Sequence, residues 1–229
     1  MSETLLVRHV LARDGRGLCT DRGDLGWRLA RLYAGLVGFG VSLALMVRAR
    51  LGLDPWDVLH QGIARHLGVP LGWVVMGVSA LVLLAWIPLR QRPGFGTISN
   101  VVVVGLVANG ALGVTPSPGS LGIRAAMLAG AIVVNGVSTA CYIGAGLGPG
   151  ARDGLMTGIA ARGHSLRAVR TGIEICALIV GVALGGSVGV GTVAYALAIG
   201  PLVHFFLPRL HPPAARPAIH QPGGEPCET

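Results

Sequence analysis

The sequence predicts an all-α integral membrane protein with six transmembrane helices, built as an inverted-topology 3+3 repeat with two short broken or re-entrant helices. Three observations lead to this fold class: a charge-poor composition, six long apolar runs and an internal repeat. Of the 229 residues, 52% are hydrophobic and only 12% are charged. A water-soluble domain carries roughly a quarter of its residues as charged side chains, so this composition argues against a soluble protein.

Six apolar runs are long enough to cross a bilayer, which takes about 20 residues of helix. They cover roughly residues 31–49, 70–89, 96–114, 124–145, 168–185 and 191–208. Two polar segments, at about 55–67 and 151–164, follow the first and the fourth run and are too short to span. Outside the runs we expect a cytoplasmic N-terminal tail at 1–27 and a disordered, proline-rich C-terminal tail at 209–229.

The formal net charge of +8 comes from arginine, since the chain has no lysine. The arginines cluster at the ends of apolar runs, which favours contact with anionic lipid and argues against nucleic-acid binding. If the N-terminus lies inside, 14 arginines fall on the inner side and 4 on the outer side, the latter being Arg48, Arg50, Arg65 and Arg124. Because cytoplasmic loops carry the excess of basic residues, this split predicts that both termini are cytoplasmic.

A repeat becomes visible when the chain is shifted by 96 residues. The stretch "GVSLALMVRARLG" at 40–52 then lies over "GVSTACYIGAGLG" at 136–148, and Asp57 falls on Asp153. With one residue deleted, "GFGT" at 94–97 falls on "GVGT" at 189–192, and Gly105 falls on Gly200. The repeats are therefore residues 28–114 and 124–208.

Each repeat holds three spans. Because three is an odd number, the first repeat ends on the opposite side of the membrane, and the second repeat must enter from there. Inverted repeats of this kind place a binding site near the midplane between the halves. In an alternative arrangement both short segments also span, which gives two parallel four-helix halves.

The two short segments read "GLDPWDVLHQGIARHLG" and "GLGPGARDGLMTGIAARGHS". Each begins with a glycine and proline break and places an aspartate, Asp57 or Asp153, at the start of a short helix. Such an acid can simply cap the helix. Alternatively, the segments line a cavity, and the aspartates pair with an arginine or bind a cationic or hydroxylic ligand group. Arg152 beside Asp153, and Arg48 and Arg50 near Asp57, are the candidate partners.

Glu174 lies inside the fifth span, where ionisable groups usually face the interior of a bundle and serve a function. Arg170 precedes it by four residues, so a local ion pair is the structural alternative. "GFGT" and "GVGT" predict turns capped by Thr97 and Thr192 at the start of the last span of each half. The candidate ligand or pathway residues are Asp57, Asp153, Arg152, Trp56, Gln61, Thr157, Glu174 and Asn100.

The sequence offers no pattern for catalysis or for a metal. Its four cysteines, Cys19, Cys141, Cys176 and Cys227, have no ligand spacing, and no Ser-His-Asp set, H-E-x-x-H motif or phosphate-binding loop occurs. We therefore expect no catalytic residue, no metal and no cofactor, and a protein that is not an enzyme.

The stretches "GLDPWDVLHQGIARHLG", "RPGFGT", "GLGPGARDGLM" and "VGVGT…IGPLVHFF" resemble the YczE/YyaS/YitT group of bacterial membrane proteins, most closely its YczE-like branch. The resemblance covers roughly residues 28–208. It implies a multi-pass protein of the bacterial plasma (inner) membrane. It supplies no catalytic or ligand residues, because the group has no settled biochemical activity.

The function expected from these features is that of a small transporter or permease-like protein in the lipid bilayer, with a site for an unknown small-molecule substrate between the repeats. One alternative is a non-transporting scaffold or regulator of a partner enzyme or assembly. Another is the substrate-binding subunit of a multi-component transporter. A homo-oligomer or a complex with a partner protein is compatible with all three.

Overall fold

The computed structural model describes residues 22–210, and this range is helical, with no strand. Its helices are α2 (Arg22–Ala49), α3 (Pro55–Leu67), α4 (Leu71–Leu89), α5 (Phe95–Val114), α6 (Leu121–Gly144), α7 (Ala151–Ala160), α8 (Leu166–Ala183) and α9 (Val190–Leu210). The first helix begins inside the tail predicted at 1–27, whose residues 1–21 lie outside the described range. Of the tail predicted at 209–229, residues 211–229 also lie outside it.

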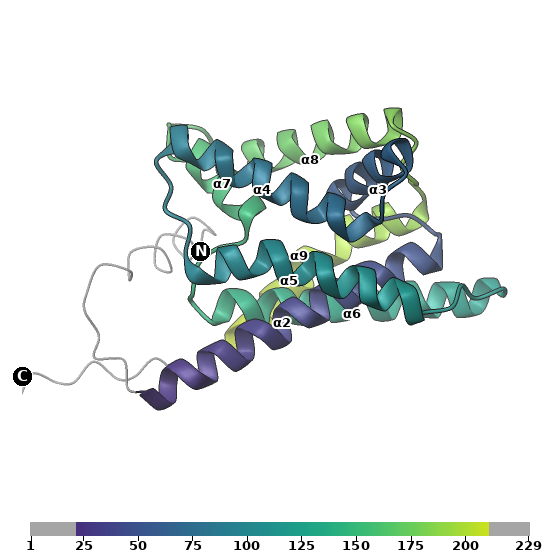
Figure 1. Ribbon diagram of the computed structural model, residues 1–229, viewed down its shortest axis with the longest axis horizontal. Helices are drawn as coiled ribbons and strands as arrows, with labels where there is room; N and C mark the ends of the chain where they lie inside the picture. The colour runs from purple at the N-terminus through teal and green to yellow at the C-terminus, as the bar shows by residue number, and fades with distance from the viewer. Residues whose placement is uncertain (1–21, 211–229) are drawn as a thin grey trace, which may run out of the picture.

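The helices form two layers (Figure 1). In one layer α2 packs along α6, with α5 against α2 and α9 against α6. In the other, α3 packs against α8 and α4 against α7, and α4 also packs on α5 of the first layer. The two short helices α3 and α7 each contact both α4 and α8, so they lie between these two longer helices.

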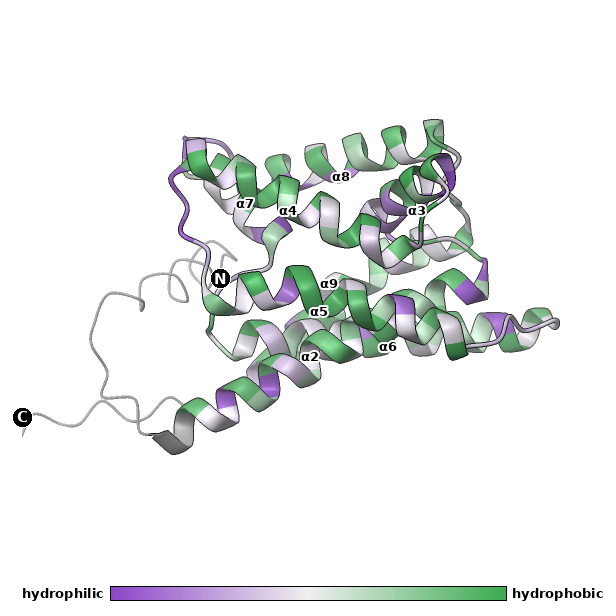
Figure 2. Ribbon diagram, in the orientation of Figure 1, coloured by the Kyte–Doolittle hydropathy of each residue, from purple (hydrophilic) through white to green (hydrophobic). Residues whose placement is uncertain are grey.

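Five helices are long and apolar enough to cross a membrane: α2 from Leu25 onward, α4, α5, α6 and α9. The remaining predicted span corresponds to α8, which is 18 residues long and includes three charged residues, Arg167, Arg170 and Glu174. Large apolar side chains are exposed on these helices, among them Leu81, Ile179 and Leu197. Figure 2 shows that hydrophobic residues predominate along the helices. Apolar residues on the outside are expected where lipid, not water, surrounds the helices.

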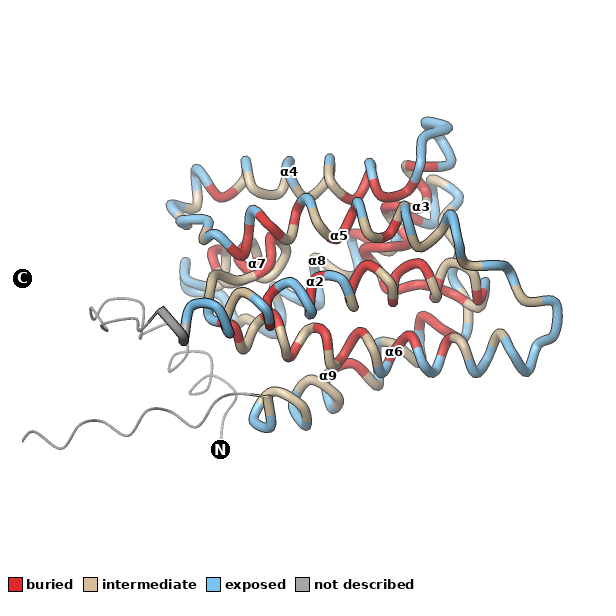
Figure 3. The backbone as a smooth tube through the Cα atoms, turned by 60° about the horizontal axis from the view of Figure 1, so that its bottom comes forward, coloured by how far each residue is buried: buried red, intermediate tan, exposed pale blue. Residues whose placement is uncertain are grey.

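The contact between α2 and α6 is the centre of the molecule. In the most apolar 18 residues of each helix, half of those in α2 are buried, compared with 17% in α9. Figure 3 shows long buried stretches in α2. The two backbones approach each other closely at Gly35. A Cβ atom there would lie 2.8 Å from the Ser138 carbonyl oxygen, so only glycine fits. The Ser42 hydroxyl donates to the Ala131 carbonyl oxygen at 2.8 Å. Small residues and buried hydroxyls thus hold these two helices together, as is common in membranes.

Glycines shape the breaks before both short helices. Gly52 has φ +117° and Gly148 has φ +122°, in the region that side-chain-bearing residues rarely adopt. A Cβ atom at Gly52 would lie 2.8 Å from Thr192 Oγ1, and one at Gly148 would lie 2.8 Å from Thr97 Oγ1. The break before α3 is therefore packed on the start of α9, and the break before α7 on the start of α5.

Two backbone hydrogen bonds fix these junctions. Gly191 N donates to Leu51 O at 2.7 Å, and Gly96 N donates to Leu147 O at 2.8 Å. The predicted threonine caps are confirmed. Thr97 Oγ1 accepts from Gly94 N at 3.2 Å, and Thr192 Oγ1 accepts from Gly189 N at 3.4 Å.

Two arginines bind the ends of the central helices. Arg28 on α2 donates to the carbonyl oxygens of Ala145 and Gly146, both at 2.8 Å. Arg124 on α6 donates to those of Ala49 and Arg50, both at 2.7 Å. Each guanidinium satisfies free carbonyl groups at the C-terminal end of the other helix, where positive charge is favourable.

Candidate functional site

The short helices α3 and α7 approach each other with their N-terminal ends. Figure 1 shows α7 toward the end of the bundle where α2 begins, and α3 toward the opposite end. Asp54 is the N-cap of α3, and Arg152 is the second residue of α7. Arg152 Nη1 lies 3.6 Å from Asp54 Oδ2, which forms an ion pair between the two predicted repeats.

Two aromatic rings flank the Arg152 guanidinium. Its Cζ atom lies 5.6 Å from the ring centroid of Phe39 and 5.5 Å from that of Trp56. Phe39 lies near the middle of the apolar stretch of α2, which runs from Leu25 to Ala49. The positive charge is therefore held by cation–π contacts about halfway along a helix that is long and apolar enough to cross a membrane.

Asp54, Asp57 and His60 form a buried chain beside this arginine. Asp54 Oδ1 accepts from Asp57 N at 2.6 Å, and His60 Nδ1 lies 3.1 Å from Asp57 Oδ1. Their exposures are only 3%, 1% and 1%. Asp54, and not Asp57, is therefore the N-cap of α3, whereas Asp57 lies in the first turn, as expected, and its carboxylate contacts His60.

Two polar atoms in this part of α3 have no protein hydrogen-bond partner among the described residues. They are Trp56 Nε1 and His60 Nε2, both buried. Leaving a polar atom buried without a hydrogen bond costs about 1–3 kcal/mol. Such atoms are available to a ligand or to water.

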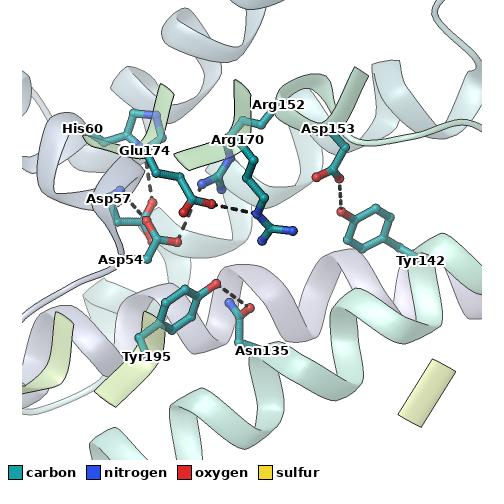
Figure 4. Close-up of polar contacts among 10 residues, drawn as sticks. All are labelled: Asp54, Asp57, His60, Asn135, Tyr142, Arg152, Asp153, Arg170, Glu174 and Tyr195. Atoms are coloured by element: carbon teal, nitrogen blue, oxygen red, sulfur yellow. Dashed lines mark hydrogen bonds and ion pairs between the residues drawn. The ribbon is translucent and has the colours of Figure 1, made fainter. Parts of the chain in front are cut away.

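Further polar contacts surround this centre (Figure 4). The Tyr142 hydroxyl donates to Asp153 Oδ2 at 2.7 Å, and the Tyr195 hydroxyl donates to Asn135 Oδ1 at 3.1 Å. Arg170 Nε donates to Glu174 Oε1 at 3.0 Å. We call the whole set the central polar cluster: Asp54, Asp57, His60, Asn135, Tyr142, Arg152, Asp153, Arg170, Glu174 and Tyr195.

The structure brings together five of the eight predicted site residues: Trp56, Asp57, Arg152, Asp153 and Glu174. The suggested pairing of Asp57 with Arg48 or Arg50 does not occur, since Asp57 contacts His60. Glu174 forms the alternative pair with Arg170, one helical turn away, and its side chain is 34% exposed.

The other three predicted residues lie apart from these contacts. Gln61 accepts from Ser187 N at 2.7 Å and so ties α3 to the segment before α9. Thr157 donates to Gly154 O of its own helix at 3.1 Å. Asn100 is half-buried in α5 and takes no part in the contacts of the cluster.

Sequence reasoning missed Asp54, His60, Tyr142 and Tyr195. A signal for Asp54 was present, because an aspartate before a proline at the first helical position is a typical N-cap. The tyrosines could not emerge from the repeat: a shift of 96 places Tyr142 on Met46, and one of 95 places Tyr195 on Asn100.

Within residues 22–210, no group of three or more histidine, cysteine, aspartate or glutamate side chains could hold a metal ion. The cluster instead combines the ion pair between two helix ends with the Arg170–Glu174 pair and the Asp57–His60 contact. Two tyrosine hydroxyls and the Asn135 amide complete it. Its chemistry is that of reversible hydrogen bonding and ion pairing.

Long apolar helices around a buried ion pair between two short helices define a multi-helix integral membrane protein. The chain belongs to the family of unknown function DUF6198, whose profile matches residues 26–208. This confirms the resemblance to YczE-like proteins.

Two relatives cover most of the chain. A protein of Haemophilus influenzae, named "Uncharacterized protein", is 41% identical over 169 residues, which are 73% of this chain and 78% of the relative. The "Uncharacterized membrane protein YczE" of Bacillus subtilis is 31% identical over 196 residues, which are 81% and 88% of the two chains. No solved structure matches the chain with significance.

Proposed function

We propose that the protein is a small transporter of the permease type, and not an enzyme, with the central polar cluster as its substrate site. The observation that carries this proposal is the buried contact between Arg152 and Asp54, at 3.6 Å, where the ends of two short helices meet. Charged groups at membrane depth are costly and usually lie on a substrate or ion pathway. The unpartnered atoms Trp56 Nε1 and His60 Nε2 belong to the first two turns of α3, directly after Asp54.

The lengths of the short helices support a position in the membrane. With 13 and 10 residues, α3 and α7 are about 20 and 15 Å long at about 1.5 Å per residue. Neither crosses a hydrocarbon core of about 30 Å, but end to end they match it. We propose that α3 and α7 are re-entrant half-helices that meet near the midplane, as broken helices do in inverted-repeat transporters.

We propose α8 as the sixth span. Its 18 residues reach about 27 Å. Its three charges, Arg167, Arg170 and Glu174, all lie in its first half, where long side chains can reach the interface or the central polar cluster. Its second half packs on α3, where a Cβ atom at Gly181 would lie 2.5 Å from Leu59 N.

Paired contacts support an inverted 3+3 repeat. The shift of 96 residues carries Arg28 to Arg124, and the acceptors of one arginine, Ala145 and Gly146, correspond to those of the other. It also carries Gly52 to Gly148, which share a positive φ and a threonine neighbour. With six spans both termini lie on one side, and the arginine split favours the cytoplasmic side of a bacterial plasma membrane.

The two halves differ in one contact, and this difference suggests how transport would proceed. Gly72 N on α4 donates to Asn109 Oδ1 on α5 at 2.7 Å, and Gly105 on α5 lies against Met76. Among the described helices, α8 forms no comparable interface with α9. We propose that this state closes one half, and that movement of α8 onto α9 would close the other, which is alternating access.

A transport assay tests the proposal without a known substrate. Purified protein is placed in liposomes loaded with a bacterial small-molecule extract, and the retained solutes are measured by mass spectrometry. We expect at least one solute to leave wild-type liposomes and to stay in those with Arg152→Gln, while Arg162→Gln, a variant at an exposed arginine outside the cluster, retains more activity.

If every solute is retained equally with wild-type protein and with empty liposomes, the transporter proposal fails. Recovery of a stoichiometric enzyme with the purified protein would then favour the scaffold or regulator reading.

A further inference from the structure

A cavity of about 420 Å³ lies between the end of α2, α3 and the segment before α9, outside the central polar cluster. Three arginines line it: Arg48, Arg50 and Arg65. No aspartate or glutamate is among its lining residues. The cavity is therefore a concave site with positive charge on several sides.

The hydrogen bonds of these arginines leave their charge uncompensated. Arg48 donates to the Leu112 carbonyl oxygen and to Ser117 Oγ, the latter at 3.3 Å. Arg65 donates to the Gly185 carbonyl oxygen and to Ser187 Oγ, the latter at 3.0 Å. Within residues 22–210, the structure pairs none of the three arginines with a carboxylate.

One further donor in the wall lacks an acceptor. Arg48 Nε is buried and has no hydrogen-bond partner among the described residues. A charged donor in this position is stabilised when an acceptor, above all an anionic one, binds next to it.

The cavity arginines differ from the arginines that hold the helices together. Arg28 and Arg124 stand at equivalent positions of the two repeats. Each donates to carbonyl oxygens at the end of the other central helix. The counterparts of Arg48, Arg50 and Arg65 after a shift of 96 residues are Gly144, Gly146 and Ala161. The positive cavity is therefore a feature of one half, and the repeated architecture does not require it.

The rest of the wall is partly apolar. Met46, Val47 and Leu53 line it, and Leu53 directly precedes Asp54 of the central polar cluster. A volume of this size matches the lower range of small-molecule sites, which combine apolar walls with a few polar groups.

We propose that the arginine cavity binds the anionic group, a carboxylate or phosphate, of a small amphipathic molecule whose apolar part rests on Met46, Val47 and Leu53. Guanidinium groups bind such oxyanions through paired hydrogen bonds. The anionic group can belong to a soluble molecule or to a lipid head group. This proposal concerns binding and holds whether or not the protein transports.

Chemical modification of arginine tests it on the full chain in nanodiscs. Phenylglyoxal, which reacts with free guanidinium groups, is applied to protein in phosphatidylcholine nanodiscs with octanoate, with the neutral analogue octanamide, or with neither. A second set of nanodiscs contains phosphatidylglycerol. The rate of modification is measured for each arginine by peptide mass spectrometry.

We expect octanoate to slow the modification of Arg50 and Arg65 by about tenfold, and octanamide to have no effect, because only the carboxylate offers a charged oxyanion to the guanidinium groups. Arg162 is the matched control, because it is exposed and also donates to a helix-end carbonyl oxygen, that of Pro88 at 2.7 Å, but lies outside the cavity. Protection by phosphatidylglycerol in place of octanoate would identify a lipid head group as the source.

The variant Arg65→Gln should abolish the protection of Arg50, and Arg162→Gln should leave it intact. If Arg65→Gln does not fold, Arg50→Gln with Arg65 as the reporter gives the same comparison. The proposal is overturned if no anionic probe protects Arg50 and Arg65 beyond Arg162, or if octanamide protects as well as octanoate.

Discussion

At the scale of single residues, the ion pair between Arg152 and Asp54 is the contact on which the central polar cluster depends. The Asp54 side chain is 4% exposed and that of Arg152 is 23% exposed, so neither charge is fully hydrated. Asp57 brings a second carboxylate to the same place, 1% exposed. Arg152 therefore compensates the negative charge of two buried carboxylates, those of Asp54 and Asp57.

Removing only the arginine should destabilise the protein strongly. We expect Arg152→Gln to lower the free energy of unfolding by about 3–5 kcal/mol, because it leaves buried carboxylates without a counter-charge. The double variant Arg152→Gln with Asp54→Asn should recover part of this loss. Denaturation of the purified variants in detergent, followed by tryptophan fluorescence, measures both.

Arg170→Gln is the control for that experiment. Its pair with Glu174 has side-chain exposures of 56% and 34% and spans one helical turn, so we expect a loss below about 1 kcal/mol. Equal losses for Arg152→Gln and Arg170→Gln would show that the buried pair has no special weight.

The sequence predicted part of this site, and the reason is the repeat. Asp57 and Arg152 were selected because they stand in matching broken segments, and the structure places both in the cluster. Their partners were assigned wrongly, since the sequence suggested local pairs, whereas Arg152 binds the Asp54 carboxylate from the other half. Which side chains meet across two halves depends on how helices pack, and the order of residues along one chain does not contain that information.

At the scale of elements, the breaks before α3 and α7 decide where the two short helices begin. We expect Gly52→Ala and Gly148→Ala each to lower the free energy of unfolding by at least about 1 kcal/mol. Both glycines have positive φ angles, and a Cβ atom would lie 2.8 Å from a threonine hydroxyl oxygen. Thermal melting in detergent checks this.

Gly77→Ala in α4 is the matched control. No heavy atom lies within 4 Å of a Cβ atom at Gly77, so alanine fits there and should leave stability unchanged or raise it by up to about 1 kcal/mol. A similar loss in all three variants would mean that the two breaks are no more demanding than an ordinary helix position.

The positions of the elements followed well from apolar patterning and from glycine and proline. The first short segment was predicted at 55–67, and α3 spans Pro55–Leu67. The second was predicted at 151–164, but α7 ends at Ala160, because the chain turns through Gly163 at φ +101°. Helix ends depend on such local turns, which an apolar pattern does not define.

At the scale of the whole molecule, the proposed topology puts the ends of the two short helices on opposite sides of the membrane. His66 near the end of α3 and His164 after α7 are both exposed. In a variant without the chain's native cysteines, we expect His66→Cys to react with a membrane-impermeant maleimide from the outside of intact cells. His164→Cys should react only after the cells are opened, and reaction of both from the same side would exclude the inverted repeat.

The packing of α4 on α5 has no counterpart between α8 and α9 among the described helices. Met76 and Gly105 are in contact across α4 and α5, where a Cβ atom on Gly105 would overlap with Met76 Cγ. The repeat places Gly172 on Met76 and Gly200 on Gly105, yet nothing lies within 4 Å of a Cβ atom at Gly172 or Gly200. If the halves exchange their packing, α8 and α9 must meet at these two glycines in the second state.

A pair of cysteines, Gly172→Cys with Gly200→Cys, should therefore form a cross-link with a short bifunctional thiol reagent in a cysteine-free background. While α4 packs on α5, nothing lies within 4 Å of a Cβ atom at either position. Cross-linking of this pair therefore measures the population of the state in which α8 packs on α9. The pair Met76→Cys with Gly105→Cys serves as the opposite control, and cross-linking one pair should lower the yield at the other. If both pairs cross-link fully in the same molecules, the two contacts coexist, and the protein does not alternate between them.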